Sequence, residues 1–133
     1  MKVVVFGVTG MLGHAMFRML SEDSRLVVYG TARREEARRY FSDELNNRLI
    51  TGIDVENHDR LASVFTTVNP NVVVNCVGLV KQLPAANDAL KVIPMNALLP
   101  HQLAMLCQQA VTRARLIHVS TDSIFQSRYE SEA

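Results

Sequence analysis

Short unbroken runs of apolar residues recur along the chain and constrain its fold more than any other feature. The runs cover residues 3–6, 26–29, 72–74 and 116–119, and a weaker one covers residues 48–51. Because they do not alternate between apolar and polar residues, they predict strands that are buried on both faces. Such strands are typical of a parallel sheet covered by helices.

Between these runs the apolar residues follow a helical period. One stripe joins Leu12, Ala15, Met16, Met19 and Leu20, a second joins Leu61, Val64, Phe65 and Val68, and a third joins Leu99, Leu103, Leu106 and Ala110. Asn57 is placed to cap the second helix, and Pro94 and Pro100 mark breaks or the first turn of the third. A more polar outer helix is expected at residues 34–41, where Glu35 precedes Arg38 and Arg39. The alternation predicts a doubly wound α/β fold with helices on both faces of the sheet.

Composition sets the class of protein. With 133 residues, 48% hydrophobic and 20% charged, the chain fits one globular domain. A formal net charge of +1 gives no positive excess for a nucleic-acid partner. Cys76 and Cys107 have no metal-ligand spacing, so no metal is expected and both are interpreted as buried hydrophobes. The first apolar run is too short for a signal peptide or a membrane span, which predicts a cytoplasmic protein without a membrane partner.

Gly7, Gly10 and Gly13 stand where the first strand gives way to a helix. A helix N-terminus there offers free N–H groups and a partial positive charge, which favour a phosphate. Gly7 would shape the turn, Gly10 would admit a pyrophosphate, and Gly13 would let the helix pack closely on the strand. The cofactor-binding residues predicted here are Gly7, Thr9, Gly10, Met11, Leu12 and Gly13. The alternative is a purely structural turn.

The end of the second strand carries the signal for the type of cofactor. An acidic residue there would bind the ribose hydroxyls of NAD(H), whereas an arginine would bind the 2′-phosphate of NADP(H). The sequence has Arg33 and Arg34 and no acidic residue at this point, which favours NADP(H) over NAD(H). Arg38 and Arg39 are expected to be surface residues only. The alternative is that all four arginines form a solvated helix face.

Five segments in the same order resemble a known family. They are GVTGMLG, DVENHDRL, NPNVVVNCVG, MNALLPHQLA and HVSTDSIF, and together they span nearly the whole chain. They are similar to the extended short-chain dehydrogenase/reductases, and most of all to the dTDP-4-dehydrorhamnose reductase group. The resemblance implies a Rossmann fold of about five parallel strands in the order 3-2-1-4-5. It also implies a reductase that acts on a 4-keto nucleotide sugar.

The resemblance assigns further cofactor contacts. Asp54 and Val55 look like the pair that borders the adenine ring, although Asp54 could instead begin a helix. The segment Cys76, Val77 and Gly78 looks like the one beside the nicotinamide ribose. Asn96 resembles an asparagine that the family keeps in its fourth helix, although it could be a helix cap. Lys81 and Gln82 fall on a loop that is either part of the active site or ordinary surface.

The last strand leads into Ser120 and Thr121, at the strand end where ligands of open α/β sheets bind. In the resembled family, the residue that matches Thr121 polarises the substrate carbonyl, Ser120 lies beside the cofactor, and a Tyr-x-x-x-Lys pair supplies the proton. Tyr129 is the only tyrosine after Thr121, and no lysine follows it by four residues.

We therefore expect residues 1–133 to be a cofactor-binding domain without a substrate domain, and inactive as such. The exposed edge of its last strand predicts self-association, for example as a homodimer. The alternative is a non-catalytic regulatory or interaction protein of the same fold, a class that includes the regulatory subunit of methionine adenosyltransferase.

Overall fold

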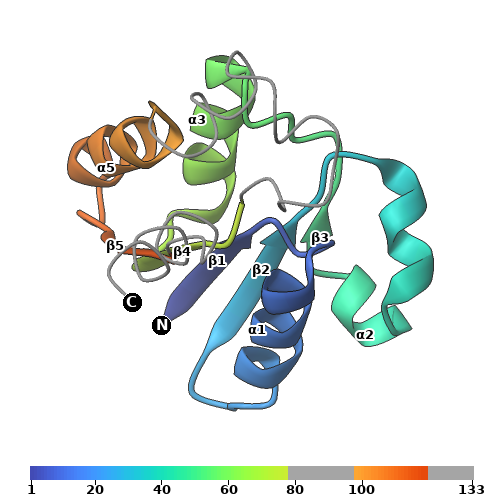
Figure 1. Ribbon diagram of the computed structural model, residues 1–133. Coiled ribbons are helices and arrows are strands. Elements are labelled where there is room, and N and C mark those ends of the chain that lie inside the picture. The colour runs from blue at the N-terminus through green and yellow to red at the C-terminus, as the bar shows by residue number, and fades with distance from the viewer. Residues whose placement is uncertain (78–97, 120–133) are drawn as a thin grey trace, which may run out of the picture.

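A computed structural model describes residues 1–77 and 98–119 of the chain (Figure 1). Within these residues, five parallel strands form one sheet in the order β3-β2-β1-β4-β5. The strands are β1 (Lys2–Phe6), β2 (Val27–Thr31), β3 (Leu49–Ile50), β4 (Val72–Asn75) and β5 (Arg115–His118). The helices are α1 (Met11–Ser21), the 3₁₀ helix η1 (Glu35–Tyr40), α2 (Asp43–Asn46), α3 (His58–Val68) and α5 (Leu99–Gln109). The predicted fold class and strand order are confirmed.

Strand β1 lies at the centre of the sheet and pairs with β2 on one side and β4 on the other. Its apolar residues are almost completely buried, since Val3 is 3% exposed and Val4, Val5 and Phe6 are 0% exposed. Burial on both faces is the reason that the sequence of this strand does not alternate. The same holds for β4, and both strands were predicted within one or two residues of their ends.

Two separate hydrophobic clusters lie on the two faces of the sheet, as Figure 1 shows from the placement of α3 and α5 on one face and α1 on the other. The first cluster contains Val4, Phe6, Ile53, Leu61, Val64, Phe65, Val68, Val73, Leu99, Leu103, Leu106, Cys107 and Ala114. The second contains Val3, Val5, Val8, Phe17, Val28, Ala32, Ala37, Phe41, Leu49 and Val74. The chain is therefore doubly wound.

Helix α1 faces the sheet with only part of the predicted stripe, since Met16 and Leu20 are half-buried against the second cluster. Its buried residues are Gly13 and Phe17, whereas Leu12 is 46% and Met19 68% exposed. A side-chain atom added at Gly30 of β2 would lie 3.0 Å from the ring of Phe17, so the missing side chain of Gly30 makes room for that ring. The contact between the ring of Phe17 and Gly30 helps to set which side of α1 faces the sheet, and hydrophobic spacing alone does not predict this contact.

Helices α3 and α5 follow their predicted stripes. All four apolar residues predicted for α3 are buried, and the side chain of Asn57 caps the helix by accepting a hydrogen bond from the N–H of Arg60. In α5 the predicted leucines are buried, and Pro100 lies in the first turn, where its missing N–H leaves no bond unmade. Pro94 lies outside the described residues.

The segment after β2 is a 3₁₀ helix rather than an α-helix, followed by the short helix α2, which the sequence did not predict. Arg38 was expected to be a surface residue, but it is a structural one. Its guanidinium donates to the carbonyl oxygens of Asn46 at 3.1 Å and of Leu49 at 3.3 Å, and it pairs with Glu35. It therefore ties η1, α2 and β3 together, whereas Arg39 is exposed and donates to the Tyr40 hydroxyl.

Candidate functional site

The turn between β1 and α1 is built around two glycines that the protein itself requires. Gly7 has φ +85°, which favours glycine, and a side-chain atom there would lie 2.9 Å from Cγ2 of Val77. A side-chain atom at Gly13 would lie 2.7 Å from the carbonyl carbon of Gly7 and closer still to its oxygen. Helix α1 therefore rests directly on the backbone of the turn, as predicted for the third glycine.

Gly10 differs from both. It caps α1 with φ −76°, and the nearest atom to an added side-chain carbon would be the oxygen of Gly7 at 3.8 Å. Among the described residues, nothing in the packing requires a glycine at this position. As far as the described part of the chain extends, the space above it is open, and Thr9, Gly10, Met11 and Leu12 are all exposed.

The N-terminus of α1 is suited to an anion. Its first backbone hydrogen bond runs from the N–H of His14 to the oxygen of Gly10 at 2.9 Å, and the cap makes no side-chain hydrogen bond. Within residues 1–77 and 98–119, the N–H groups of the first turn are thus left for another acceptor, at the positive end of the helix dipole. The first turn carries no acidic residue that would repel a phosphate.

The ends of β1 and β4 meet beside this turn. The N–H of Cys76 donates to the oxygen of Phe6 at 3.0 Å, and Val77 lies against Gly7. This is the point at which the order of the strands reverses, where open α/β sheets bind ligands. Burial raises the pKa of the Cys76 thiol, which does not favour a reactive thiolate.

The ends of β2 and β3 bring together two more of the predicted residues. The guanidinium of Arg33 lies 4.0 Å from the carboxylate of Asp54, and both side chains are substantially exposed. Asp54 also accepts a hydrogen bond from the N–H of Glu56 at 3.0 Å, so it shapes the turn that leads to α3. Arg34 is exposed and precedes η1, and Val55 follows Asp54 at the same edge of the sheet.

Sequence reasoning missed a polar pair at the ends of β4 and β5. Asn75 is completely buried, and its side-chain nitrogen lies 3.0 Å from Nδ1 of His118. The available signal was a polar residue directly after one apolar run, Asn75, and one inside another, His118.

The remaining predicted residues, Gly78, Asn96, Ser120 and Thr121, lie outside the described residues, as do Lys81, Gln82 and Tyr129. Within residues 1–77 and 98–119, no group of three or more His, Cys, Asp or Glu side chains is placed to hold a metal ion. No helix in that part of the chain is both long enough and apolar enough to cross a membrane.

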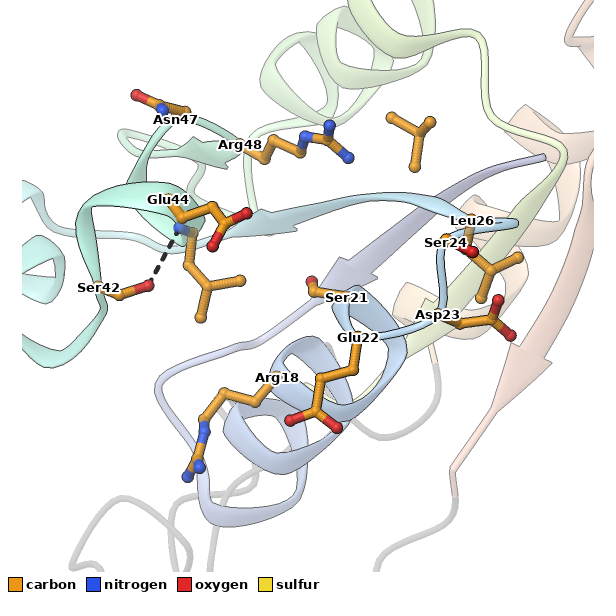
Figure 2. A pocket seen from close by; sticks show the side chains of 12 residues that line it. Arg18, Ser21, Glu22, Asp23, Ser24, Leu26, Ser42, Glu44, Asn47 and Arg48 are labelled. Atoms are coloured by element: carbon orange, nitrogen blue, oxygen red, sulfur yellow. Dashed lines mark hydrogen bonds between the residues drawn. The ribbon is translucent and has the colours of Figure 1, made fainter.

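A cavity of about 780 Å³ lies at the opposite end of the sheet, beside the start of β2 (Figure 2). Arg18 lines it from α1, Glu22, Asp23 and Ser24 from the residues that follow this helix, and Glu44 from α2. Because ligands of such sheets bind at the carboxyl ends of the strands, this cavity is distinct from the candidate site.

The strand order, the glycine turn and the open helix N-terminus define the class of protein: an α/β protein of the Rossmann type. Residues 1–132 match the family model described as RmlD substrate binding domain. The chain belongs to this family. No curated protein matches the chain.

Solved structures agree with the fold. A short-chain dehydrogenase/reductase from Saccharomyces cerevisiae, YIR035C, superimposes with a TM-score of 0.73 at 20% identity, over 92% of this chain and 54% of that one. The dTDP-4-dehydrorhamnose reductase of Bacillus anthracis, in complex with NADP, superimposes with a TM-score of 0.67 at 22% identity, over 94% of this chain and 38% of that one. The Bordetella bronchiseptica enzyme WbmH, in complex with NAD⁺, superimposes with a TM-score of 0.63 at 18% identity, over 81% of this chain and 35% of that one. The chain thus spans about half of the yeast protein and little more than a third of the other two.

Proposed function

We propose that this chain binds NADP(H) at the carboxyl end of its sheet and is the cofactor half of a reductase of 4-keto nucleotide sugars. The observation that carries the proposal is Gly10. Gly7 and Gly13 are explained by the packing of the protein itself, whereas the nearest atom to a side-chain carbon at Gly10 would be 3.8 Å away. A side chain there would fill the space above the free N–H groups of α1, which is the space that a pyrophosphate needs.

The preference for NADP(H) rests on charge at the end of β2. Arg33 and Arg34 are exposed cations that follow the end of β2 after one residue, and residues 31–34 include no acidic residue that could bind ribose hydroxyls. Asp54 partly balances Arg33 at 4.0 Å, which leaves Arg34 as the stronger candidate for the 2′-phosphate. A hydrogen bond to a charged group contributes about 1.5–3 kcal/mol, which corresponds to about one to two decades of cofactor preference.

The proposed activity rests on family membership and on the motifs around the strand ends. When bound, the cofactor would supply a hydride for the reduction of a carbonyl group. Thr121 is proposed to polarise that carbonyl, and Asp54 with Val55, and Cys76 with Val77 and Gly78, to border the two ends of the cofactor. Asn96 and Ser120 complete the proposed set. These 133 residues contain no Tyr-x-x-x-Lys pair after Thr121, so we expect them to bind cofactor without oxidising it.

The binding test compares NADPH and NADH by calorimetry or fluorescence titration. We expect NADPH to bind about ten to a hundred times more tightly, and the double variant Arg33→Ala/Arg34→Ala to remove that difference. Arg39→Ala is the matched control, since it removes an exposed cation from the same segment, one that donates to Tyr40. Gly10→Ala should weaken both cofactors at least about tenfold.

Each outcome bears on a separate part of the proposal. If neither cofactor binds, or if Gly10→Ala binds as well as the native chain, the cofactor site is wrong. If both cofactors bind equally and the arginine variants change nothing, the preference for NADP(H) is wrong. NADPH oxidation with a dTDP-4-keto sugar by these 133 residues would contradict the expected inactivity. The non-catalytic alternative predicts cofactor binding without such oxidation in the full-length protein as well.

A further inference from the structure

Asn75 and His118 end two neighbouring strands beside the proposed cofactor site. They face each other in the register of β4 and β5. Asn75 is 0% exposed, so its amide must find partners inside the protein. Its oxygen accepts a hydrogen bond from the N–H of Val77 at 3.1 Å, and its nitrogen lies 3.0 Å from Nδ1 of His118.

The chemistry of these groups fixes every proton in the pair. A backbone N–H can only donate, so the amide oxygen of Asn75 must face Val77 and its amino group must face His118. The amino group can also only donate, which requires Nδ1 of His118 to accept. The neutral ring of His118 must therefore carry its proton on Nε2. A doubly protonated ring would present a second donor to the amino group and lose this hydrogen bond.

Asn75 is hydrogen-bonded to a backbone segment that contacts the glycine turn. A side-chain atom at Gly7 would lie 2.9 Å from Cγ2 and 3.0 Å from the backbone nitrogen of Val77, so a small displacement of Val77 would disturb the turn. The N–H that Asn75 holds belongs to this same residue. On the other side, His118 is the last residue of β5, directly before the segment that leads to Ser120 and Thr121.

We propose that Asn75 and His118 are positioning residues for the nicotinamide half of the site, an inference that rests on the proposed function. Asn75 acts through the N–H of Val77, and His118 acts by holding the amide of Asn75 in one orientation. The adenosine half of the cofactor would be held at the ends of β2 and β3, by residues that do not contact this pair. The hydrogen bond between the two side chains thus links the segment after β4 with the strand that precedes the proposed catalytic residue.

The test uses a matched pair of variants at His118, which is exposed, whereas Asn75 is buried. His118→Asn keeps an acceptor at the δ position, whereas His118→Leu removes it. The probes are NADPH and 2′,5′-ADP, which represents the adenosine half alone. We expect His118→Leu to weaken NADPH about tenfold and 2′,5′-ADP less than about twofold, and His118→Asn to restore NADPH binding. Asn75→Leu should give the same pattern as His118→Leu.

An independent readout is the tautomer of His118. Long-range ¹⁵N–¹H spectra of the neutral ring should show the proton on Nε2 in the native chain, and a mixture of tautomers in Asn75→Leu. A native ring protonated at Nδ1 would overturn the inference. So would equal losses for both probes, or a His118→Asn variant that binds NADPH no better than His118→Leu. If the native chain binds neither probe, the proposed function fails and the positioning role with it, whereas the wrong tautomer contradicts the pair alone.

Discussion

Gly13 offers the sharpest test of how α1 is held against the sheet. In the variant Gly13→Ala, the added methyl carbon would lie 2.7 Å from the carbonyl carbon of Gly7 and 3.1 Å from Cα of Val8. Non-bonded carbon atoms pack favourably at about 3.5–4.0 Å, so the helix must move away by on the order of 1 Å. The obstacle is backbone, and no change of rotamer can relieve the contact.

The cost follows from that displacement. Adding a methylene to a tightly packed core costs about 1–3 kcal/mol, and the upper end applies here because Phe17, which is 0% exposed, would be pulled from Gly30 and Phe41. Alanine favours a helix over glycine by about 1 kcal/mol, which offsets part of the cost. We expect the free energy of unfolding to fall by about 2 kcal/mol.

Urea denaturation followed by circular dichroism measures this change. With a slope of about 1–3 kcal/mol per molar urea, the midpoint should fall by roughly 1 M at an unchanged slope. Gly10→Ala is the control, because its methyl carbon would meet no atom closer than 3.8 Å. It should cost at most about 1 kcal/mol, from the poorer helix cap. A Gly13→Ala protein as stable as the native one would show that α1 does not rest on the turn.

Three further outcomes are expected. Asn57→Ala should lower the free energy of unfolding by about 1 kcal/mol in the same denaturation assay, since Asn57 caps α3; an unchanged midpoint would contradict that role. Burial raises the pKa of the Cys107 thiol to about 11, so a thiol reagent at pH 8 should modify it only on unfolding. The side-chain hydrogen bond from Arg25 lowers the pKa of Asp23 from 3.8 to about 2, so the stabilisation from this pair is lost as the pH falls through about 2. A ¹³C titration of the Asp23 carboxyl should show this pKa, and Arg25→Ala should raise the pKa.

The strands could be predicted because a strand that is buried on both faces has apolar residues at consecutive positions. Residues 3–6 and 72–74 are unbroken apolar runs, and both form strands at the centre of the sheet. At the edge of the sheet the apolar run is weaker, and residues 48–51 contain a strand of only two residues, Leu49–Ile50. The N-cap at Asn57 and the place of Pro100 in the first turn of α5 could also be predicted, because both depend on local chemistry.

Hydrophobic spacing predicted the orientation of α1 only in part, with Met16 and Leu20 but not Leu12 and Met19, because contacts with distant backbone also set it. Gly30 is far from Phe17 in sequence, and only the folded sheet shows that its missing side chain leaves room for that ring. Arg38 was misread for a similar reason, since its partners are carbonyl oxygens on α2 and β3. An arginine that ties three segments has the same sequence signature as one in solvent.

The candidate site was predictable where it depends on one stretch of chain and less so where it depends on pairs. The roles of Gly7 and Gly13 in the turn follow from the position of the glycines between a strand and a helix. The ion pair of Arg33 with Asp54 and the hydrogen bond of Asn75 with His118 each join two strand ends. No spacing rule links such residues until the order of the strands is known.

The two faces of the sheet differ in how freely they can change over evolutionary time. Under α3 and α5, side chains meet side chains, and one such layer can exchange a leucine for a methionine if a neighbour compensates. Under α1, a helix meets bare main chain at Gly7 and an aromatic ring meets a strand glycine, and neither contact has a partner that could compensate. Substitutions should therefore accumulate mostly on the face covered by α3 and α5. The face covered by α1, whose N-terminus lies at the proposed phosphate position, should change more slowly.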